Sequence, residues 1–269
     1  MASIEIKDLH FSYTDSRHRL KALKDINLDI RDGEFLCLIG ASGCGKSTLL
    51  RVLAGLEKAE RGGVYIGGEK VEGPGADRMI VFQDYALFPW MTALKNVSYA
   101  VKRARRVSSS EAKHIAESFL EKVGMSHAKH MYPKQLSGGM KQRVAIARAL
   151  AMDTDILLLD EPFGALDART RATLQELLLE LWDKGEGKKK TVIFVTHDIN
   201  EAILLADRVV FMKPGEIEAE MAIDLPRPRK DEADYAEYRE KLLELFEEYK
   251  PEERDDEVEE EEVRNEEEI

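Results

Sequence analysis

The chain has 269 residues, of which 43% are hydrophobic and 34% charged, a composition typical of a soluble globular protein with one large domain or two small ones. No apolar stretch reaches the ~20 residues that a membrane span needs, and no basic segment followed by an apolar one opens the chain, so we expect a cytosolic protein without a signal peptide. The formal net charge is −12 and no broad basic face is evident, which argues against a nucleic-acid partner.

Two segments near the start have the alternating pattern of half-buried strands. Apolar and polar residues alternate over 3–13 and again over 22–30, and Asp32-Gly33 is typical of a turn into the next strand. These segments predict an antiparallel β layer that leads into a buried strand over 35–39. A short strand is also predicted over 64–66, bracketed by the glycine pairs 62–63 and 67–68.

A glycine-rich turn follows the apolar run 35–39 and leads into a helix. Its glycines let several backbone N–H groups point at one anion, and the dipole of the following helix favours the same anion. We expect Lys46 to reach the β- and γ-phosphates of a nucleoside triphosphate, Ser47 to bind Mg²⁺, and Thr48 to contact the α-phosphate. The predicted phosphate-binding loop consists of Gly40, Ala41, Ser42, Gly43, Cys44, Gly45, Lys46, Ser47 and Thr48.

The two cysteines, Cys37 and Cys44, lack the spacing of metal ligands. Cys37 is predicted to be a buried strand residue. Cys44 lies in the phosphate-binding loop, where oriented amides lower the pKa of a thiol. We therefore expect Cys44 to be reactive and to be protected by bound nucleotide.

Between residues 92 and 130 apolar residues recur at helical spacing, which predicts a helical insert with a helix that starts near Ser108. Helices are also predicted over 140–152, 166–182, 199–206 and 231–250, and strands over 156–159, 191–195 and 209–212. Strands that alternate with helices indicate a parallel sheet with right-handed crossovers. Residues 251–269 contain 12 acidic and two basic residues, and we expect them to form a disordered tail.

Two carboxylates, Asp160 and Glu161, follow the apolar run 156–159. The carboxyl ends of parallel strands are where ligands bind in such sheets. Asp160 is therefore predicted to bind the metal, and Glu161 to orient and deprotonate the water that attacks the γ-phosphate. The alternative for this pair is an acidic cap at the end of a strand.

A second candidate anion site precedes the predicted helix 140–152. Ser137, Gly138 and Gly139 stand at the start of this helix, where free N–H groups and the helix dipole attract an anion. One nucleotide needs only one such cradle, and residues 40–48 already supply it. The alternative is an ordinary serine N-cap.

With these motifs in place, the chain closely resembles ATP-binding cassette (ABC) proteins. Their signature, Leu-Ser-Gly-Gly followed by Gln-Arg, is matched by residues 136–139 and 142–143. The resemblance covers roughly residues 3–225 and implies an α/β fold: a P-loop NTPase core with a mainly parallel sheet, an antiparallel β subdomain and a helical subdomain inserted at roughly 88–150. Five further elements match in order: Tyr13, Gln83, Asp160-Glu161-Pro162, Ala165-Leu166-Asp167 and His197.

The resemblance also implies roles for these residues. Tyr13 stacks on the adenine, Gln83 senses the metal and the attacking water, and His197 holds the γ-phosphate and positions Glu161. Asp167, in the D-loop, is also expected to contribute to nucleotide binding.

The resemblance further implies that two copies pack head to tail. The segment Ser137–Gly139 of one copy then caps the γ-phosphate held by Lys46 of the other. ATP closes this homodimer and hydrolysis releases it.

An ABC protein without a membrane span is expected to dock on the inner face of the membrane onto separate permease subunits. Residues 84–91 are rich in large apolar groups and are expected to line the docking groove, or else to pack the core of the insert. Segments 73–78, 88–90 and 224–229 resemble importers of nitrate, sulfonates and taurine, which receive cargo from a solute-binding protein. The alternatives are a soluble ATPase acting on ribosomes or DNA, and an exporter subunit. Residues 226–250 are expected to form a helical extension.

Overall fold

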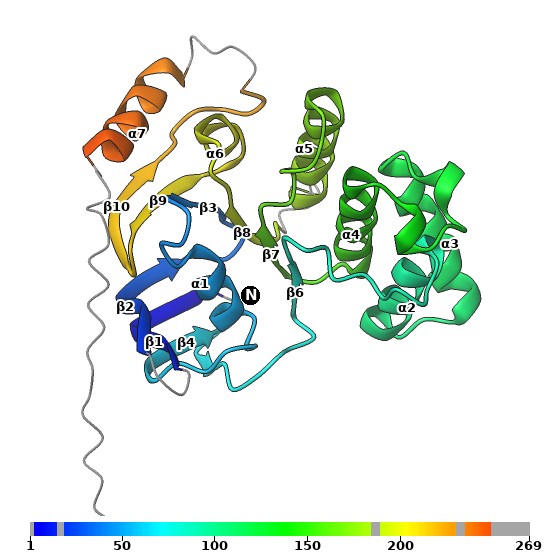
Figure 1. Cartoon of the computed structure of the whole chain (residues 1–269), viewed down its shortest axis with the longest axis horizontal. Coiled ribbons are helices and arrows are strands. Elements are labelled where there is room, and N and C mark those ends of the chain that lie inside the picture. The colour runs from blue at the N-terminus through cyan, green and yellow to red at the C-terminus, as the bar shows by residue number, and fades with distance from the viewer. Residues whose placement is uncertain (1–2, 15–18, 184–188, 230–234, 249–269) are drawn as a thin grey trace, which may run out of the picture.

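The computed structural model describes residues 3–14, 19–183, 189–229 and 235–248 of the protein. Two β-sheets lie one above the other, and a group of helices projects to one side (Figure 1). The antiparallel sheet has the order β2-β1-β4-β5. Its strands are β1 (Ile4–Thr14), β2 (Arg19–Ile30), β4 (Arg61–Ile66) and β5 (Glu69–Lys70).

The second sheet has the order β10-β9-β3-β8-β7-β6. Five of its strands are parallel, and β10 adds an antiparallel edge. The carboxyl ends of the parallel strands therefore share one edge of the sheet. The strands are β3 (Phe35–Gly40), β6 (Arg78–Val81), β7 (Ile156–Asp160), β8 (Thr191–Val195), β9 (Arg208–Lys213) and β10 (Glu216–Ala222).

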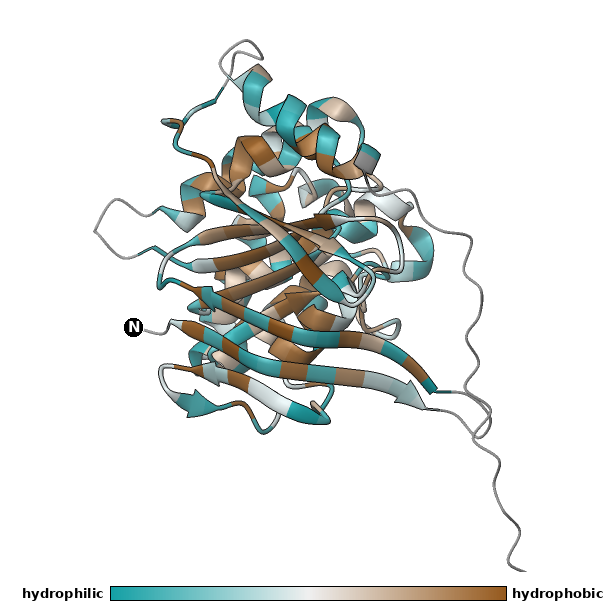
Figure 2. Ribbon diagram, turned by 90° about the vertical axis from the view of Figure 1, so that its left-hand side faces the viewer, coloured by the Kyte–Doolittle hydropathy of each residue, from teal (hydrophilic) through white to brown (hydrophobic). Residues whose placement is uncertain are grey.

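The parallel strands are almost continuously apolar because both faces of their sheet are covered (Figure 2). On β3, Leu36 and Leu38 point into a core shared with the antiparallel sheet and with α1 (Lys46–Leu53). Phe35 and Cys37, on the opposite face, belong to the core beneath the remaining helices. Helix α1 thus lies between the two sheets and is held by both.

The remaining helices cover the other face of the parallel sheet and one end of the molecule (Figure 1). The projecting group contains α2 (Ala93–Arg105), α3 (Ser109–Lys122) and the short 3-10 turns Ser126–Ala128 and Pro133–Gln135, packed on α4 (Gly138–Met152). Ser108 caps α3, as predicted, because its hydroxyl accepts a hydrogen bond from the Glu111 N–H. The others are α5 (Ala168–Trp182), α6 (Ile199–Leu205) and α7 (Ala236–Glu248).

The predicted fold class is confirmed, and most elements lie where the sequence placed them. Among the differences, the pair Gly62-Gly63 lies within β4 rather than before it. Gly62 has φ +69°, and a Cβ there would lie 2.1 Å from the carbonyl oxygens of Lys7 and Asp8, so only glycine lets β4 approach the irregular part of β1. Strands β5, β6 and β10 were not predicted. Residues 251–269 and both ends of the predicted helix 231–250 lie outside the described residues. None of the described helices is long and apolar enough to cross a membrane.

Candidate nucleotide-hydrolysis site

The predicted phosphate-binding loop connects β3, in the centre of the parallel sheet, to α1. Gly40 and Gly45 have φ values of +147° and +110°, and a Cβ at either position would lie within 2.7 Å of a backbone oxygen. These two positions therefore require glycine. The surface of the loop is formed by Ala41, Ser42 and Gly43, which are partly or fully exposed.

The ammonium group of Lys46 is buried beneath this loop. Its Nζ donates hydrogen bonds to the carbonyl oxygens of Gly40 and Ala41, each at 2.8 Å. A fixed cation and the amino-terminal end of α1 therefore face the same turn. This arrangement suits an anion with several oxygens, such as the phosphates of a nucleotide.

The structure argues against the predicted reactivity of Cys44. Its side chain is only 1% exposed and belongs to the core between the two sheets. A reagent reaches such a thiol only when the loop opens. Cys37 is also buried, as predicted, and burial raises the pKa of its thiol well above the ordinary value.

Ser47 and Asp160 lie side by side, as their predicted roles require. The Ser47 Oγ donates a hydrogen bond to Asp160 Oδ1 at 3.0 Å. Asp160 ends β7 and is 5% exposed, and this burial raises the pKa of its carboxyl group. A hydroxyl and a carboxylate are both oxygen ligands of the kind that Mg²⁺ prefers, so the pair fits this ion.

Glu161 lies beside the pair and is approached by two other predicted site residues. Its Oε2 lies 3.4 Å from Gln83 Nε2 and 3.5 Å from His197 Nδ1. The three residues follow β7, β6 and β8, which are neighbours in the sheet. Glu161 has φ +46°, a conformation that non-glycine residues avoid and that clusters at functional sites.

Gln142 on α4 holds the backbone of Glu161, a role that the sequence did not indicate. Its Nε2 donates to the Glu161 carbonyl oxygen at 3.1 Å, while its Oε1 accepts from the Ala165 N–H at 3.0 Å. Gln142 is 2% exposed. Gln142 thus links α4, which carries most of the signature, to the strained backbone of Glu161. Its only sequence signal was its place in that signature.

Glu201, also missed from the sequence, supports the segment that carries His197. Its Oε2 accepts a 2.7 Å hydrogen bond from Thr196 Oγ1, and its Oε1 accepts from Gln175 Nε2 at 3.2 Å. Arg171 of α5 lies 3.7 Å from the same carboxylate. Burial raises the pKa of Glu201, and the network ties α5 and α6 to the turn before His197.

Tyr13 and Thr48 are brought together at the other end of the loop. The Tyr13 hydroxyl lies 3.2 Å from Thr48 Oγ1, and the Tyr13 ring packs edge-on against Phe11 with centroids 4.9 Å apart. Tyr13 is 37% exposed. A partly open aromatic face therefore lies beside the phosphate-binding loop.

Ser137 and Asp167 act as helix N-caps within the single chain. Ser137 Oγ accepts from the Met140 N–H at 3.3 Å, and Asp167 Oδ1 accepts from the Thr170 N–H at 3.0 Å, which lowers the pKa of Asp167. Gly139 lies against the loop before α5, since a Cβ there would be 3.0 Å from the Ala165 carbonyl oxygen. Within the described part of the chain, neither Ser137 nor Asp167 bonds to residues 40–48.

Several known proteins are similar to this chain in fold and in sequence. The protein-family model described as ABC transporter matches residues 23–164. The nitrate import ATP-binding protein NrtD of Synechococcus elongatus is 48% identical over 241 residues, covering 86% of this chain and 87% of that protein. The bicarbonate transport ATP-binding protein CmpD of Synechocystis sp. is 46% identical over 232 residues, covering 85% and 81%. A solved dimeric ATP-binding cassette, in a post-hydrolysis state with ADP and Pi, has a TM-score of 0.76 at 36% identity and covers 83% of this chain and 100% of its own.

The fold, with its glycine-rich loop between β3 and α1, is that of a P-loop nucleotide hydrolase. The similarities extend over most of the chain and over most of each relative. The chain belongs to the ABC transporter family, and it is an ABC-type transporter ATPase that binds ATP.

Proposed function

We propose that this protein is the ATPase subunit of an importer and uses ATP with Mg²⁺. The observation that carries this proposal is the convergence of Gln83, Glu161 and His197 beside the Ser47–Asp160 pair. Mg²⁺, when held by Ser47, Asp160 and Gln83, supplies charge to the phosphates. Residues 1–225 form the cassette, with its helical subdomain at 88–150, and α7 belongs to the extension that follows.

The residues of the site have separate tasks in this proposal. The N–H groups of residues 40–48 and the Lys46 ammonium bind the phosphates, and Tyr13 stacks on the adenine. Glu161 takes a proton from the attacking water. His197 holds the γ-phosphate and positions Glu161, while Gln83 senses the metal and the water; both contact Glu161 Oε2. Gln142 positions the backbone of Glu161, and Glu201 positions the turn before His197; neither is assigned a contact with the nucleotide.

Two copies complete each site in a head-to-tail homodimer. Among the described residues, Ser137 and Asp167 cap helices of their own chain and make no bond to residues 40–48, so in this proposal they act on the nucleotide held by a second copy. The related cassette of known structure is dimeric. The γ-phosphate joins the two copies, because charge-assisted hydrogen bonds reach it from both.

Mixing two inactive variants tests this arrangement. Lys46→Ala removes the phosphate cation, and Ser137→Arg fills the cap with a bulky side chain, so each variant alone should be inactive. Random pairing makes half of the dimers mixed, each with one intact site, so hydrolysis should recover to at most about a quarter of the wild-type rate. Phosphate release over a range of mixing ratios provides the measurement.

The matched control for this mixture is Lys46→Ala with Glu161→Gln. Both residues belong to the same half of a site, so no pairing restores a complete one and no activity should return. The shared site would be contradicted if the mixture of Lys46→Ala with Ser137→Arg stayed inactive, or if the mixture of Lys46→Ala with Glu161→Gln recovered activity.

The proposed permease-docking surface consists of Phe88, Trp90 and Tyr99. Trp90 is 69% exposed, with its ring 5.6 Å from Phe88, which lies 5.8 Å from Tyr99. Asn96 Oδ1 accepts from the Phe88 N–H at 2.8 Å and anchors this segment on α2. Exposed aromatic residues beside the segment after Gln83 suit a permease helix. The protein then works on the inner face of the membrane.

Trp90→Ala is expected to weaken assembly with the permease and to spare ATP binding. Losing a central aromatic anchor typically costs about 2 kcal/mol or more. Co-purification with the permease and a nucleotide-binding titration provide the measurement. Leu56→Ala is the control, since Leu56 is 46% exposed in the turn after α1. Unchanged recovery of the Trp90→Ala complex would place the docking surface elsewhere.

The proposed cargo is a small anion such as nitrate, bicarbonate or a sulfonate, delivered to the permease by a solute-binding protein. Its support is the similarity to the nitrate import and bicarbonate transport proteins. The same similarity favours an importer over an exporter and over an ATPase acting on ribosomes or DNA. The ligand of the solute-binding protein encoded beside this gene tests the assignment.

A further inference from the structure

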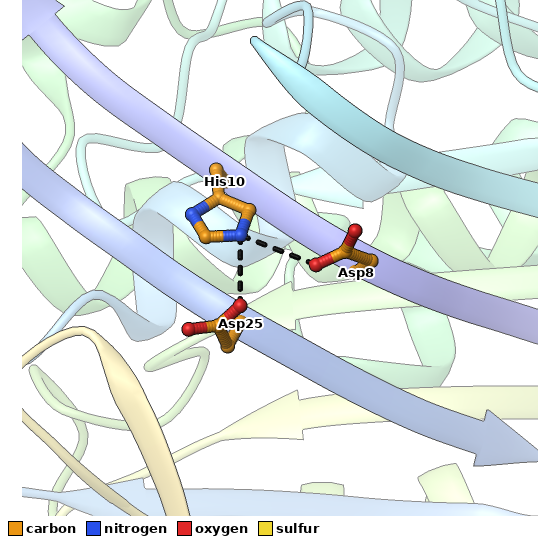
Figure 3. Close-up of side chains that lie close together, drawn as sticks. All are labelled: Asp8, His10 and Asp25. Carbon is orange, nitrogen blue, oxygen red and sulfur yellow. Dashed lines mark hydrogen bonds and ion pairs between the residues drawn. The ribbon is translucent and has the colours of Figure 1, made fainter.

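Three side chains outside the nucleotide site meet on the antiparallel sheet (Figure 3). His10 Nε2 lies 2.9 Å from Asp25 Oδ1 and 3.3 Å from Asp8 Oδ1. One ligand atom from each residue lies within 4.8 Å of the other two. Asp8 and His10 belong to β1 and Asp25 to β2, so the cluster joins two strands.

The pairing of β1 and β2, which is irregular here, places these residues on one face. The register shifts between Ile6 and Leu9 and again between Leu9 and Phe11. Asp8 and Asp25 lie at these shifts with φ values of +46° and +49°. Asp8 and His10 are two residues apart on β1 and therefore share a face, and the pairs Leu9–Ile26 and Phe11–Leu23 set Asp25 opposite His10.

The distances suit ligands of one metal ion. At a metal–ligand length of about 2.1 Å, ligands at right angles lie about 3.0 Å apart and tetrahedral ligands about 3.4 Å apart. The two distances from Nε2, 2.9 and 3.3 Å, lie within about 0.1 Å of these values. A protonated Nε2 has only one hydrogen for the two carboxylate oxygens, whereas a cation contacts all three atoms at once.

Neighbouring side chains hold one carboxylate and the backbone of both aspartates in place. Arg61 Nη2 contacts Asp8 Oδ2 at 2.9 Å, which leaves Oδ1 facing His10. Asn27 accepts from the Asp8 N–H at 2.9 Å and donates to the Asp25 carbonyl oxygen at 3.0 Å. Partners that orient ligands in this way are typical around metal sites.

We propose that Asp8, His10 and Asp25 bind a divalent transition-metal ion such as Zn²⁺. One imidazole nitrogen and two carboxylate oxygens favour Zn²⁺ over Mg²⁺, which prefers oxygen ligands alone. Asp25 supplies a full negative charge to the ion, while Asp8 shares its charge with Arg61. The side chains are 23%, 43% and 60% exposed for His10, Asp8 and Asp25, so water completes the coordination.

The bound ion would fasten β1 to β2 on the outer face of their sheet. Tyr13, the proposed adenine contact, lies on β1 three residues beyond His10 and pairs with Leu20 of β2. The metal therefore stabilises the strand pair that carries this contact. It is separate from the Mg²⁺ of the nucleotide site.

Calorimetric titration of the metal-stripped, nucleotide-free protein with Zn²⁺ tests the proposal. His10→Asn and Asp25→Asn should each weaken the site by at least about 10- to 100-fold, the loss typical even of orienting residues around a metal. His114→Asn is the control, because His114 is exposed on α3. The control should bind Zn²⁺ as the wild type does.

A second measurement separates loss of the site from loss of the fold. Zn²⁺ should raise the unfolding temperature of the wild type and of His114→Asn, but not that of His10→Asn, whose unfolding without metal should remain cooperative. Equal Zn²⁺ binding by all variants, or wild-type binding only at millimolar concentration, would overturn the proposal and leave the cluster as an ion pair.

Discussion

Glu161→Gln is expected to lower the rate of ATP hydrolysis by about 10²- to 10⁴-fold, the usual loss when a positioned base is removed. The amide has nearly the shape of the carboxylate but cannot take the proton of the attacking water. Contacts to Gln83 and His197 survive in altered form, because the amide keeps one acceptor oxygen. Steady-state phosphate release and an ATP-binding titration measure the two effects separately.

The variant should also accumulate as an ATP-bound dimer, since the γ-phosphate that joins the two copies in the proposed homodimer is not removed. Size-exclusion chromatography with and without ATP detects this change. Glu176→Gln is a suitable control, because Glu176 is exposed on α5. Turnover by Glu161→Gln near the wild-type rate would remove Glu161 from the role of base.

The parts of the site that are contiguous in the chain were predictable from the sequence. Residues 40–48 run from the end of β3 into α1, so their local pattern was enough to predict a turn whose backbone N–H groups suit an anion. Glu161 and Gln83 are 78 residues apart, and their contact depends on β6 and β7 being neighbours. The sequence indicated parallel strands with a shared carboxyl edge but not the order of those strands.

Three edge strands, β5, β6 and β10, were missed because their sequences alone do not identify them as strands. β6 has four residues and β5 has two, too few to display a period. β10 alternates acidic residues with Ile217, Ala219 and Met221, and becomes a strand through its pairing with β9. Gln142 and Glu201 were missed because their value lies in tertiary hydrogen bonds.

The segment 224–229 was singled out only for its resemblance to importers, and the structure gives it a physical role. Arg227 contacts Asp207 at 2.7 Å and lies over the Trp182 ring. Arg229 is 6% exposed, and its guanidinium donates to the carbonyl oxygens of Ile203, Ala206, Ile223 and Leu225. It thereby joins the chain after β10 to the end of α6.

Arg229→Met is therefore expected to lower the free energy of unfolding by about 2–4 kcal/mol, because each buried carbonyl left unpaired costs about 1–3 kcal/mol and water restores some of the bonds. Burial lowers the pKa of Arg229 to about 10, so the wild-type side chain remains a cation at neutral pH. Urea denaturation at constant pH provides the measurement.

Arg239→Met removes the same charge from an exposed position on α7 and should leave the free energy of unfolding within about 0.5 kcal/mol of the wild type. Since α6 directly follows His197, Arg229→Met should also slow ATP hydrolysis at temperatures where the variant is still folded. If the two variants unfolded at the same urea concentration, Arg229 would not be the anchor of this segment, and α6 would depend on its apolar contacts alone.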